Sequence, residues 1–298
     1  MNFFHPETVK RISQLELRAK HIVDGFMNGL HKSQHFGNSV EFRQHRQYVP
    51  GDDPRSVDWK VWARQDRLYV KQYEVDTNLR LRLFVDVSKS MSFGTGAMTK
   101  YDYACTAAVS LAYLALRQQD AVGCTAFDAD RYIDLPPKTK RSQLTAIAQQ
   151  LTNIDGKLTT ALTRVDDGTL PLAAGLQHHK TLVIVLSDLL FERAGLFQTL
   201  QTLRSFGHDV AVLHILDAME LDFALGGAVQ FDALELPMNI RCHPKSLRKD
   251  YLYAVNSYLE EVKQGCAALQ CDYALLRTDT PLDAALPVYL SRRTFNTL

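Results

Sequence analysis

One apolar run that ends in acidic and hydroxyl side chains constrains this chain more than any other feature. Residues 79–87 are mostly apolar and predict a buried strand, and Asp86, Ser88 and Ser90 lie at its end. Residues 101–117 then have the apolar pattern of a long buried helix. Open α/β sheets build their binding sites where a strand releases polar side chains at its carboxyl end. We therefore predict an α/β fold with a site at the end of this strand.

Downstream of residue 122, strand-like and helix-like segments alternate. The predicted strands are 122–127, 181–186, 209–216 and 273–276, and the predicted helices are 141–151, 196–206 and 247–269. The run 181–186 is a continuous series of β-branched and leucine residues, which is typical of a strand covered on both faces. This alternation predicts a mostly parallel sheet with helices on both faces.

The first 77 residues do not follow that alternation. Residues 5–31 have helical periodicity, whereas the segment after Gly37 is short, polar and aromatic. We predict an N-terminal helix and a small β elaboration over residues 1–77, attached to an α/β domain over residues 78–298. Residues 219–245 are irregular again, and we expect them to pack with this elaboration.

Composition argues against several classes of partner. The 298 residues carry a formal net charge of +1, which gives no reason to expect nucleic acid or an anionic membrane. No apolar run reaches the roughly 18 residues of a membrane span, and the N-terminus lacks the pattern of a signal peptide. The five cysteines form no C-x-x-C pair, so we expect reduced core residues. These features predict a cytoplasmic protein without membrane insertion.

A second carboxylate follows the buried run 181–186. Because parallel strands end at the same edge of a sheet, we expect Asp188 to meet Asp86 there. With Ser88 and Ser90 they form an oxygen-only set of low charge, which predicts weak binding of Mg²⁺ or Mn²⁺. The alternative is that each aspartate only caps the helix after its strand.

A threonine hydroxyl from an intervening loop could complete this metal site. Thr169, which precedes an apolar stretch, is our first choice, and Thr159 and Thr160 are the rivals. Spacing does not separate them, and each could instead be a helix N-cap.

The same residues argue against a familiar catalytic site. An aspartyl-phosphate enzyme needs an acid two residues after Asp86, where this chain has Ser88. Neither Ser88 nor Ser90 has the G-x-S-x-G setting of a serine nucleophile. We predict no catalytic residues, with a metal-dependent hydrolase that uses the same Asp/Ser site as the alternative.

Together these motifs resemble a known family. The D-x-S-x-S sequence, with an aspartate ending a later strand, resembles the metal-ion-dependent adhesion site of von Willebrand factor A domains. A closer resemblance is to the bacterial family called domain of unknown function 58 (DUF58). The segments that carry it are 48–60 (Y-V-P-G-D-D-P-R-S-V-D-W-K), 63–64, 70–74, 84–91, 186–189 and 214–217 with Glu220.

This resemblance implies a von Willebrand factor A-like domain with an N-terminal elaboration. It implies adhesion-site ligands at Asp86, Ser88, Ser90 and Asp188, and Gly168-Thr169 resembles the family's glycine-threonine step. It also implies a MoxR-type AAA+ ATPase as partner and no established enzymatic activity. We therefore expect a non-catalytic, metal-dependent protein-binding module.

Overall fold

The computed structural model describes most of the chain in two compact units. One unit comprises residues 1–30 and 79–298, and the other comprises residues 31–78. The described residues are 6–30, 42–47, 61–62, 68–73, 79–128, 131–154, 163–164, 180–191, 193–225, 229–232, 239–242 and 244–295. The motif at 48–60 and the three threonines Thr159, Thr160 and Thr169 lie outside this set.

A seven-stranded sheet forms the centre of the larger unit. In spatial order its strands are β11 (Asp272–Arg277), β8 (Asp209–Leu216), β7 (Leu182–Ser187), β3 (Arg80–Asp86), β4 (Ala121–Phe127), β5 (Arg131–Lys138) and β6 (Thr163–Arg164). The first five strands are parallel, and β5 and β6 continue the sheet in antiparallel fashion. The predicted mostly parallel sheet is confirmed.

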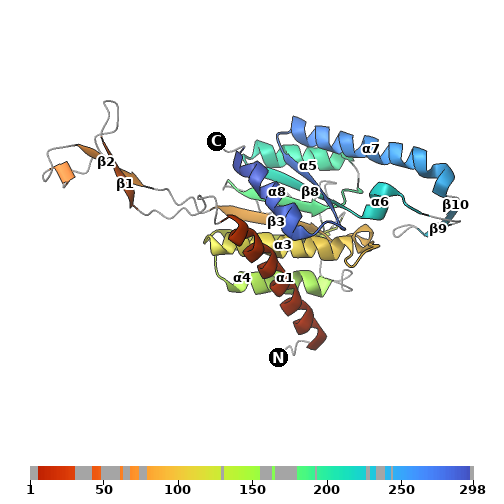
Figure 1. The fold of residues 1–298 in the computed structure, drawn as a ribbon, viewed down its shortest axis with the longest axis horizontal. Helices are drawn as coiled ribbons and strands as arrows, with labels where there is room; N and C mark the ends of the chain where they lie inside the picture. Colours follow the sequence, from red (N-terminus) through yellow and green to blue (C-terminus); the bar gives the residue numbers. More distant parts are fainter. Residues whose placement is uncertain are drawn as a thin grey trace. The chain divides into compact units, whose positions relative to one another are not determined.

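Helices cover both faces of this sheet (Figure 1). Successive strand side chains point to opposite faces, so Leu83 joins one core and Phe84 the other. The core on the Leu83 face includes residues of α1 (Pro6–Leu30), α3 (Lys100–Arg117), α4 (Ser142–Ile154) and α8 (Leu282–Phe295). The core on the Phe84 face includes residues of α5 (Arg193–Ser205) and α7 (Pro244–Ala268).

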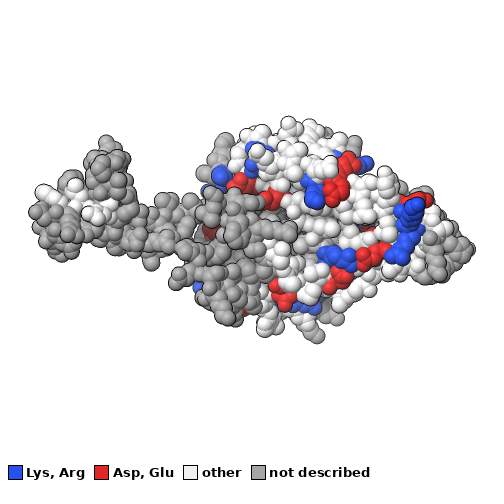
Figure 2. All heavy atoms as spheres, turned by 45° about the horizontal axis from the view of Figure 1, so that its top comes forward, with Lys and Arg blue, Asp and Glu red and all other residues white. Residues whose placement is uncertain are grey.

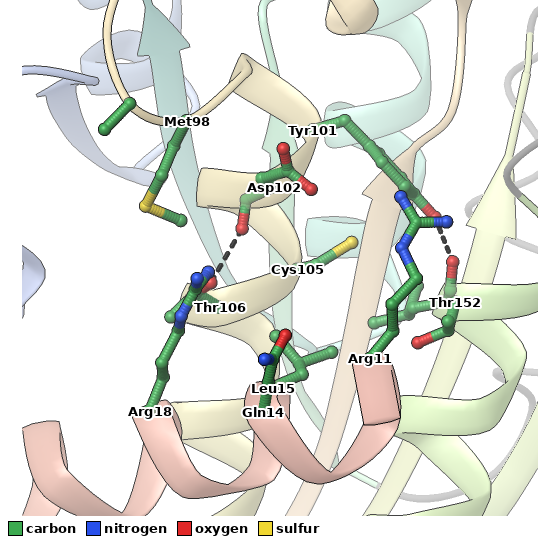
Figure 3. Close-up of a pocket in the computed structure, with 12 residues that line it drawn as sticks. Arg11, Gln14, Leu15, Arg18, Met98, Tyr101, Asp102, Cys105, Thr106 and Thr152 are labelled. Atoms are coloured by element: carbon green, nitrogen blue, oxygen red, sulfur yellow. Dashed lines mark hydrogen bonds between the residues drawn. The ribbon is translucent and has the colours of Figure 1, made fainter. Parts of the chain in front are cut away.

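The N-terminal helix packs on the α/β body. Residues of α1 contact α3, α4 and α8, and Ile12 and Ala19 are buried in the shared core. Its polar side chains line a cavity of about 200 Å³ with residues of α3 and α4 (Figure 3). Two hydroxyls there form hydrogen bonds within the fold, because Tyr101 donates to the Leu151 carbonyl and Thr106 to that of Asp102.

The two compact units divide after residue 30 and before residue 79, so α1 belongs to the larger unit. The sequence instead places α1 with the β elaboration, in a domain that ends at residue 77.

The elaborations are small antiparallel pairs. In the unit of residues 31–78, β1 (Phe42–Gln47) pairs with β2 (Tyr69–Tyr73). In the larger unit, α6 (Ala218–Asp222) precedes a hairpin of β9 (Val229–Asp232) and β10 (Asn239–Cys242). Packing of residues 219–245 with the N-terminal elaboration stays a prediction. Among the described residues, no helix combines the length and the apolar character needed to cross a membrane.

Candidate functional site

Asp86 is the last residue of β3 and lies beside the end of β7. The parallel register pairs Val85 with Leu186, so Asp86 and Ser187 are neighbours on adjacent strands. The Ser187 hydroxyl donates to Oδ2 of Asp86 at 2.5 Å, and the Ser88 backbone N–H donates to Oδ1 at 2.9 Å. Asp86 is 1% exposed, so two hydrogen bonds fix a buried carboxylate at the carboxyl edge of the sheet.

The two predicted serines flank the start of a short turn beside this carboxylate. A 3-10 turn, η2 (Lys89–Ser92), follows Ser88 directly. The hydroxyl oxygens of Ser88 and Ser90 come within 3.0 Å of each other. A cavity of about 240 Å³ is lined by both serines and by Asp86, Asp128 and Asp188. The turn therefore gathers the D-x-S-x-S side chains around one space.

The environment of Asp86 disfavours its charged form. Burial, together with the nearby negative charge of Asp188, raises the pKa of Asp86 from 3.8 to about 6. Hydrogen bonds from Ser187 and Ser88 oppose this rise only in part. No lysine or arginine among the described residues pairs with Asp86, whose partners are Ser187 and Ser88. Its negative charge therefore has no cationic partner among the described residues.

Asp188 follows β7 and has a buried cationic partner. The Lys100 ammonium, at the start of α3, lies 2.8 Å from Oδ2 of Asp188 and 2.7 Å from Oε1 of Glu220. Lys100 is fully buried and Asp188 is 1% exposed. The other oxygen of Asp188 accepts the Leu190 backbone N–H at 3.3 Å. The fold thus supplies Asp188 with the positive charge that Asp86 lacks.

Glu220 links this ion pair to α6 and the neighbouring loops. Its second oxygen accepts the Asp217 backbone N–H at 2.8 Å, forming the capping box of α6. The Asp217 carboxylate in turn accepts hydrogen bonds from the hydroxyls of Thr95 and Thr278, at 2.5 and 2.9 Å. Asp217 and Glu220 therefore have a structural role, because they fix α6 against the neighbouring loops.

Hydrogen bonds that involve His214, Tyr273 and Tyr258 hold the backbone of the loop that contains Asp188. Nε2 of His214 lies 2.9 Å from the Asp188 carbonyl, and Nδ1 lies 2.8 Å from the Tyr273 hydroxyl. Burial lowers the pKa of His214 to about 4, so the ring is neutral near pH 7. Because a carbonyl only accepts, Nε2 carries the proton and Nδ1 accepts from Tyr273. Tyr258 donates to the carbonyl of Leu189, whose φ is +55°. A buried leucine in this left-handed conformation shows that the loop is tightly constrained.

The structure therefore brings four of the predicted residues together at one cavity. These are Asp86, Ser88, Ser90 and Asp188, while the threonine candidates lie outside the described residues. Asp188 does not cap the following helix, because its carboxylate bonds Leu190 and α5 begins only at Arg193.

Four residues contribute to this region without having been predicted as site residues. They are Ser187, Lys100, Glu220 and Asp128, of which Ser187 and Glu220 lie in the segments that carry the family resemblance. A usable signal existed for Asp128, which directly follows the predicted strand 122–127, as Asp188 comes shortly after 181–186. A lysine at the start of an apolar helix gives no comparable signal, because it usually extends into solvent.

A cation at this cavity would need serine hydroxyls as ligands in addition to carboxylates. Among the described residues, no three histidine, cysteine, aspartate or glutamate side chains gather as a metal site. A site here would combine the un-neutralised carboxylate of Asp86 with the hydroxyls of Ser88 and Ser90, which are hard oxygen ligands suited to Mg²⁺. The residues therefore fit a weakly held ion.

Comparison with known proteins places the chain in a family. The family model described as "Protein of unknown function DUF58" matches residues 44–260, and the chain belongs to this family. Two similar proteins are the uncharacterized proteins Mb1516 of Mycobacterium bovis and Rv1480 of Mycobacterium tuberculosis. Each is 26% identical over 284 residues, covering 92% of this chain and 86% of the relative.

Two solved structures have a distant likeness to the chain. The conserved hypothetical protein BatB of Bacteroides thetaiotaomicron has a TM-score of 0.42 at 11% identity, over 72% of this chain and 98% of its own. An aerotolerance-related membrane protein of Bacteroides fragilis, with multiple mutations to serines, also scores 0.42 at 14% identity, over 74% and 100%.

Proposed function

We propose that the chain is a non-catalytic, metal-dependent protein-binding module of the von Willebrand factor A type. The observation that carries this proposal is the un-neutralised carboxylate of Asp86, which faces one cavity together with Ser88 and Ser90. Mg²⁺ or Mn²⁺ would be held by these three residues, and Asp188, which lines the same cavity and pairs with Lys100, would support the site. Thr169 is the proposed additional ligand.

The charges explain why such an ion would bind weakly. Asp86 supplies one negative charge, whereas Lys100 offsets that of Asp188. Hydroxyl ligands add no charge, so this site has fewer anionic ligands than a tight calcium site. When bound, the ion would offer a coordination position to an acidic side chain of a partner. Asp86, Ser88 and Ser90 would then orient that contact from the sheet edge.

A protein partner suits the surface better than nucleic acid does. On the face shown in Figure 2, many of the basic and acidic side chains of the described residues lie close together. Nucleic-acid binding requires a basic surface. The resemblance to DUF58 proteins suggests a MoxR-type AAA+ ATPase as the partner. Four described cysteines are buried free thiols, which supports a cytoplasmic location.

Metal binding can be tested by Mn²⁺ relaxation and by calorimetry with Mg²⁺. Asp86→Asn removes the charge at nearly constant volume and should weaken binding at least tenfold. Asp120→Asn is the matched control, because Asp120 is also buried but accepts the Leu79 N–H at the opposite end of the strands. Equal binding by the wild type and Asp86→Asn would contradict the metal site.

Partner binding is a separate test. The MoxR-type ATPase of the same genome should be retained by the immobilised chain in Mg²⁺, and released by EDTA or by Asp86→Asn. Added NaCl should change the interaction only modestly, because the net charge of +1 gives little long-range steering. Retention that survives both chelation and Asp86→Asn would show that the ion does not make the contact.

A metal-dependent hydrolase is the alternative function. His214 is poorly suited to act as a base, because both of its ring nitrogens bond within the fold. A screen of phosphate and carboxylic esters separates the two functions. Turnover that is lost in Asp86→Asn would establish the hydrolase and overturn the binding module.

A further inference from the structure

The edge strand β11 lies in a groove away from the Asp86 cavity. A cavity of about 960 Å³ runs along the strand, with residues of α7 and α8 on its sides. The side from α7 includes Leu259, Glu260 and Lys263, and the side from α8 includes Ala284 and Val288. The groove is therefore bounded by two helices and open at the edge of the sheet.

The backbone of β11 faces this groove at alternate residues. Thr278 donates its N–H to the Leu216 carbonyl of β8, in line with the register that pairs Arg277 with Leu216. In a parallel pair, the backbone groups of alternate residues point to opposite sides. The N–H and C=O groups of Tyr273 and Leu275 and the N–H of Arg277 therefore point outward, whereas the Arg277 carbonyl accepts the Thr280 N–H at 3.1 Å. Within the described part of the chain, β8 is the only strand that pairs with β11.

An open strand edge of this kind is usually protected in native proteins. Charged side chains, prolines and bulges commonly block such edges. Between its ends, β11 has the residues Tyr273, Ala274, Leu275 and Leu276, and Leu275 is 38% exposed. The central part of this edge lacks each of those blocking features.

The charges along the groove are paired within the chain. Lys263 pairs with Glu260 at 3.3 Å. Arg277 pairs with Asp222 at 2.7 Å and with Asp279 at 3.0 Å. Asp272 lies at the first position of β11, at one end of the groove. The middle of the groove thus matches an occupant without charge, which would supply backbone hydrogen bonds and apolar side chains.

The shape of the groove favours a single strand over a second copy of this chain. A second copy that paired its own β11 here would bring an α7 and an α8 against the same two helices. One extended segment has no such flanking helices and can lie between the walls. Strand addition to a sheet edge is a common mode of peptide recognition.

We propose that the outer edge of β11, between α7 and α8, binds an extended, uncharged and apolar segment of a partner protein by strand addition. The segment would pair with the outward N–H and C=O groups of Tyr273 and Leu275 and with the outward N–H of Arg277. Its side chains would contact Leu259 on one side and Ala284 and Val288 on the other. This site is independent of the metal site, because it shares no residue with the Asp86 cavity.

A phage-displayed library of random dodecapeptides is the probe, selected on the full-length protein. Leu275→Pro removes one outward N–H, keeps the inward ladder to β8 and is tolerated at a sheet edge. Leu275→Ala is its control, because it shortens the same side chain but keeps the N–H. Ala284→Trp fills the groove from an exposed helix position, and Ala254→Trp is a matched exposed position of α7 outside the groove.

We expect selected peptides to be uncharged and free of proline. Calorimetry with the synthetic peptides should show at least tenfold weaker binding to Leu275→Pro and to Ala284→Trp. Binding to Leu275→Ala and Ala254→Trp should change less than threefold. Hydrogen exchange followed by NMR should slow at the amides of Tyr273, Leu275 and Arg277 when the peptide binds. If Leu275→Pro fails to fold, the Ala284→Trp variant and the hydrogen-exchange data still test whether the peptide pairs with β11.

Four outcomes would overturn the proposal. Selection could yield no peptide, or only peptides that bind Ala284→Trp as well as the wild type. The three outward amides could already be protected in the free monomer, which would show that the chain itself covers the edge. A wild-type dimer that Leu275→Pro converts to a monomer would identify a second copy as the occupant.

Discussion

The neighbouring strands β3 and β7 each lead into a loop with a buried aspartate, but the two carboxylates have different partners. Asp86 receives two neutral hydrogen bonds and no cation from the described part of the chain, and its pKa rises to about 6. Asp188 receives the buried ammonium of Lys100. A carboxylate that the fold leaves un-neutralised is suited to an external cation, whereas a neutralised one serves the structure. We therefore propose that the Asp86 loop binds the ion and that the Asp188 loop supports it.

The largest effect on stability should come from Lys100→Met. This change leaves the buried Asp188 and the half-buried Glu220 without their shared cation, and breaking a buried pair from one side costs about 3–5 kcal/mol. Urea unfolding in Mg²⁺-free buffer measures the loss. Lys180→Met is the control, because Lys180 is largely exposed and pairs with Asp209 at 3.4 Å, so its loss should stay below about 1 kcal/mol. Equal effects of the two changes would remove the structural role of Lys100.

The contrast between these loops also shows what a sequence can predict. Strand 209–216 was predicted with the bounds that β8 has, because its apolar pattern is continuous and local. The pattern of Asp86, Ser88 and Ser90 is likewise local. Lys100 was missed, because it meets Asp188 and Glu220 across 88 and 120 residues of sequence, and only the fold brings them together.

Strand β5 was missed for a different physical reason. It contains Pro136 and Pro137, which lack N–H donors and argue against a central strand. The strand lies near the antiparallel end of the sheet, where its ladder with β4 is irregular between Val122 and Cys124. Helix α8 was missed because Pro287 interrupts its pattern. In both β5 and α8, proline residues obscured the sequence pattern of an element that forms in the folded protein.

The next largest effect on stability should come from Asp86→Asn, and it should be a gain where Lys100→Met causes a loss. In the absence of metal, Asp86→Asn should stabilise the protein by about 3 kcal/mol at pH 7, because it removes a buried charge whose pKa is raised from 3.8 to about 6. Asp188→Asn should destabilise it, because Lys100 then loses a partner. Urea unfolding in EDTA measures both. Destabilisation by Asp86→Asn would show that the Asp86 charge is satisfied by the fold.

The sign of the pH dependence follows from the same shift. The folded pKa of Asp86 lies above its unfolded value, so folded protein binds more protons than unfolded protein between about pH 4 and 6. The wild type therefore loses stability from this group as pH rises through that window. His214, whose folded pKa is lowered to about 4, acts oppositely and is common to both proteins. The advantage of Asp86→Asn should consequently vanish near pH 4.

A smaller effect should come from Tyr258→Phe. This change removes the hydroxyl that donates to the Leu189 carbonyl at 2.6 Å, and one such hydrogen bond contributes about 1 kcal/mol. If the Asp188 loop is a support, stability should fall by that amount while Mg²⁺ affinity changes less than twofold. Calorimetry and urea unfolding on the same samples test both halves. A tenfold loss of affinity would instead make the Asp188 loop part of the ion site.

The smallest effect on stability should come from Ser90→Ala, together with a clear effect on the ion. The Ser90 hydroxyl lies 3.0 Å from that of Ser88, at a half-buried position, so its removal should change the free energy of unfolding by less than about 0.5 kcal/mol. As a proposed ligand, its loss should weaken Mg²⁺ binding several-fold. Ser92→Ala is the matched control, because the Ser92 hydroxyl donates to the Lys89 carbonyl and does not line the cavity. Equal Mg²⁺ affinities of the two variants would show that Ser90 is not a ligand. The assignment of ion binding to the whole D-x-S-x-S loop would then fail, because only Asp86 and Ser88 would be left to hold the cation.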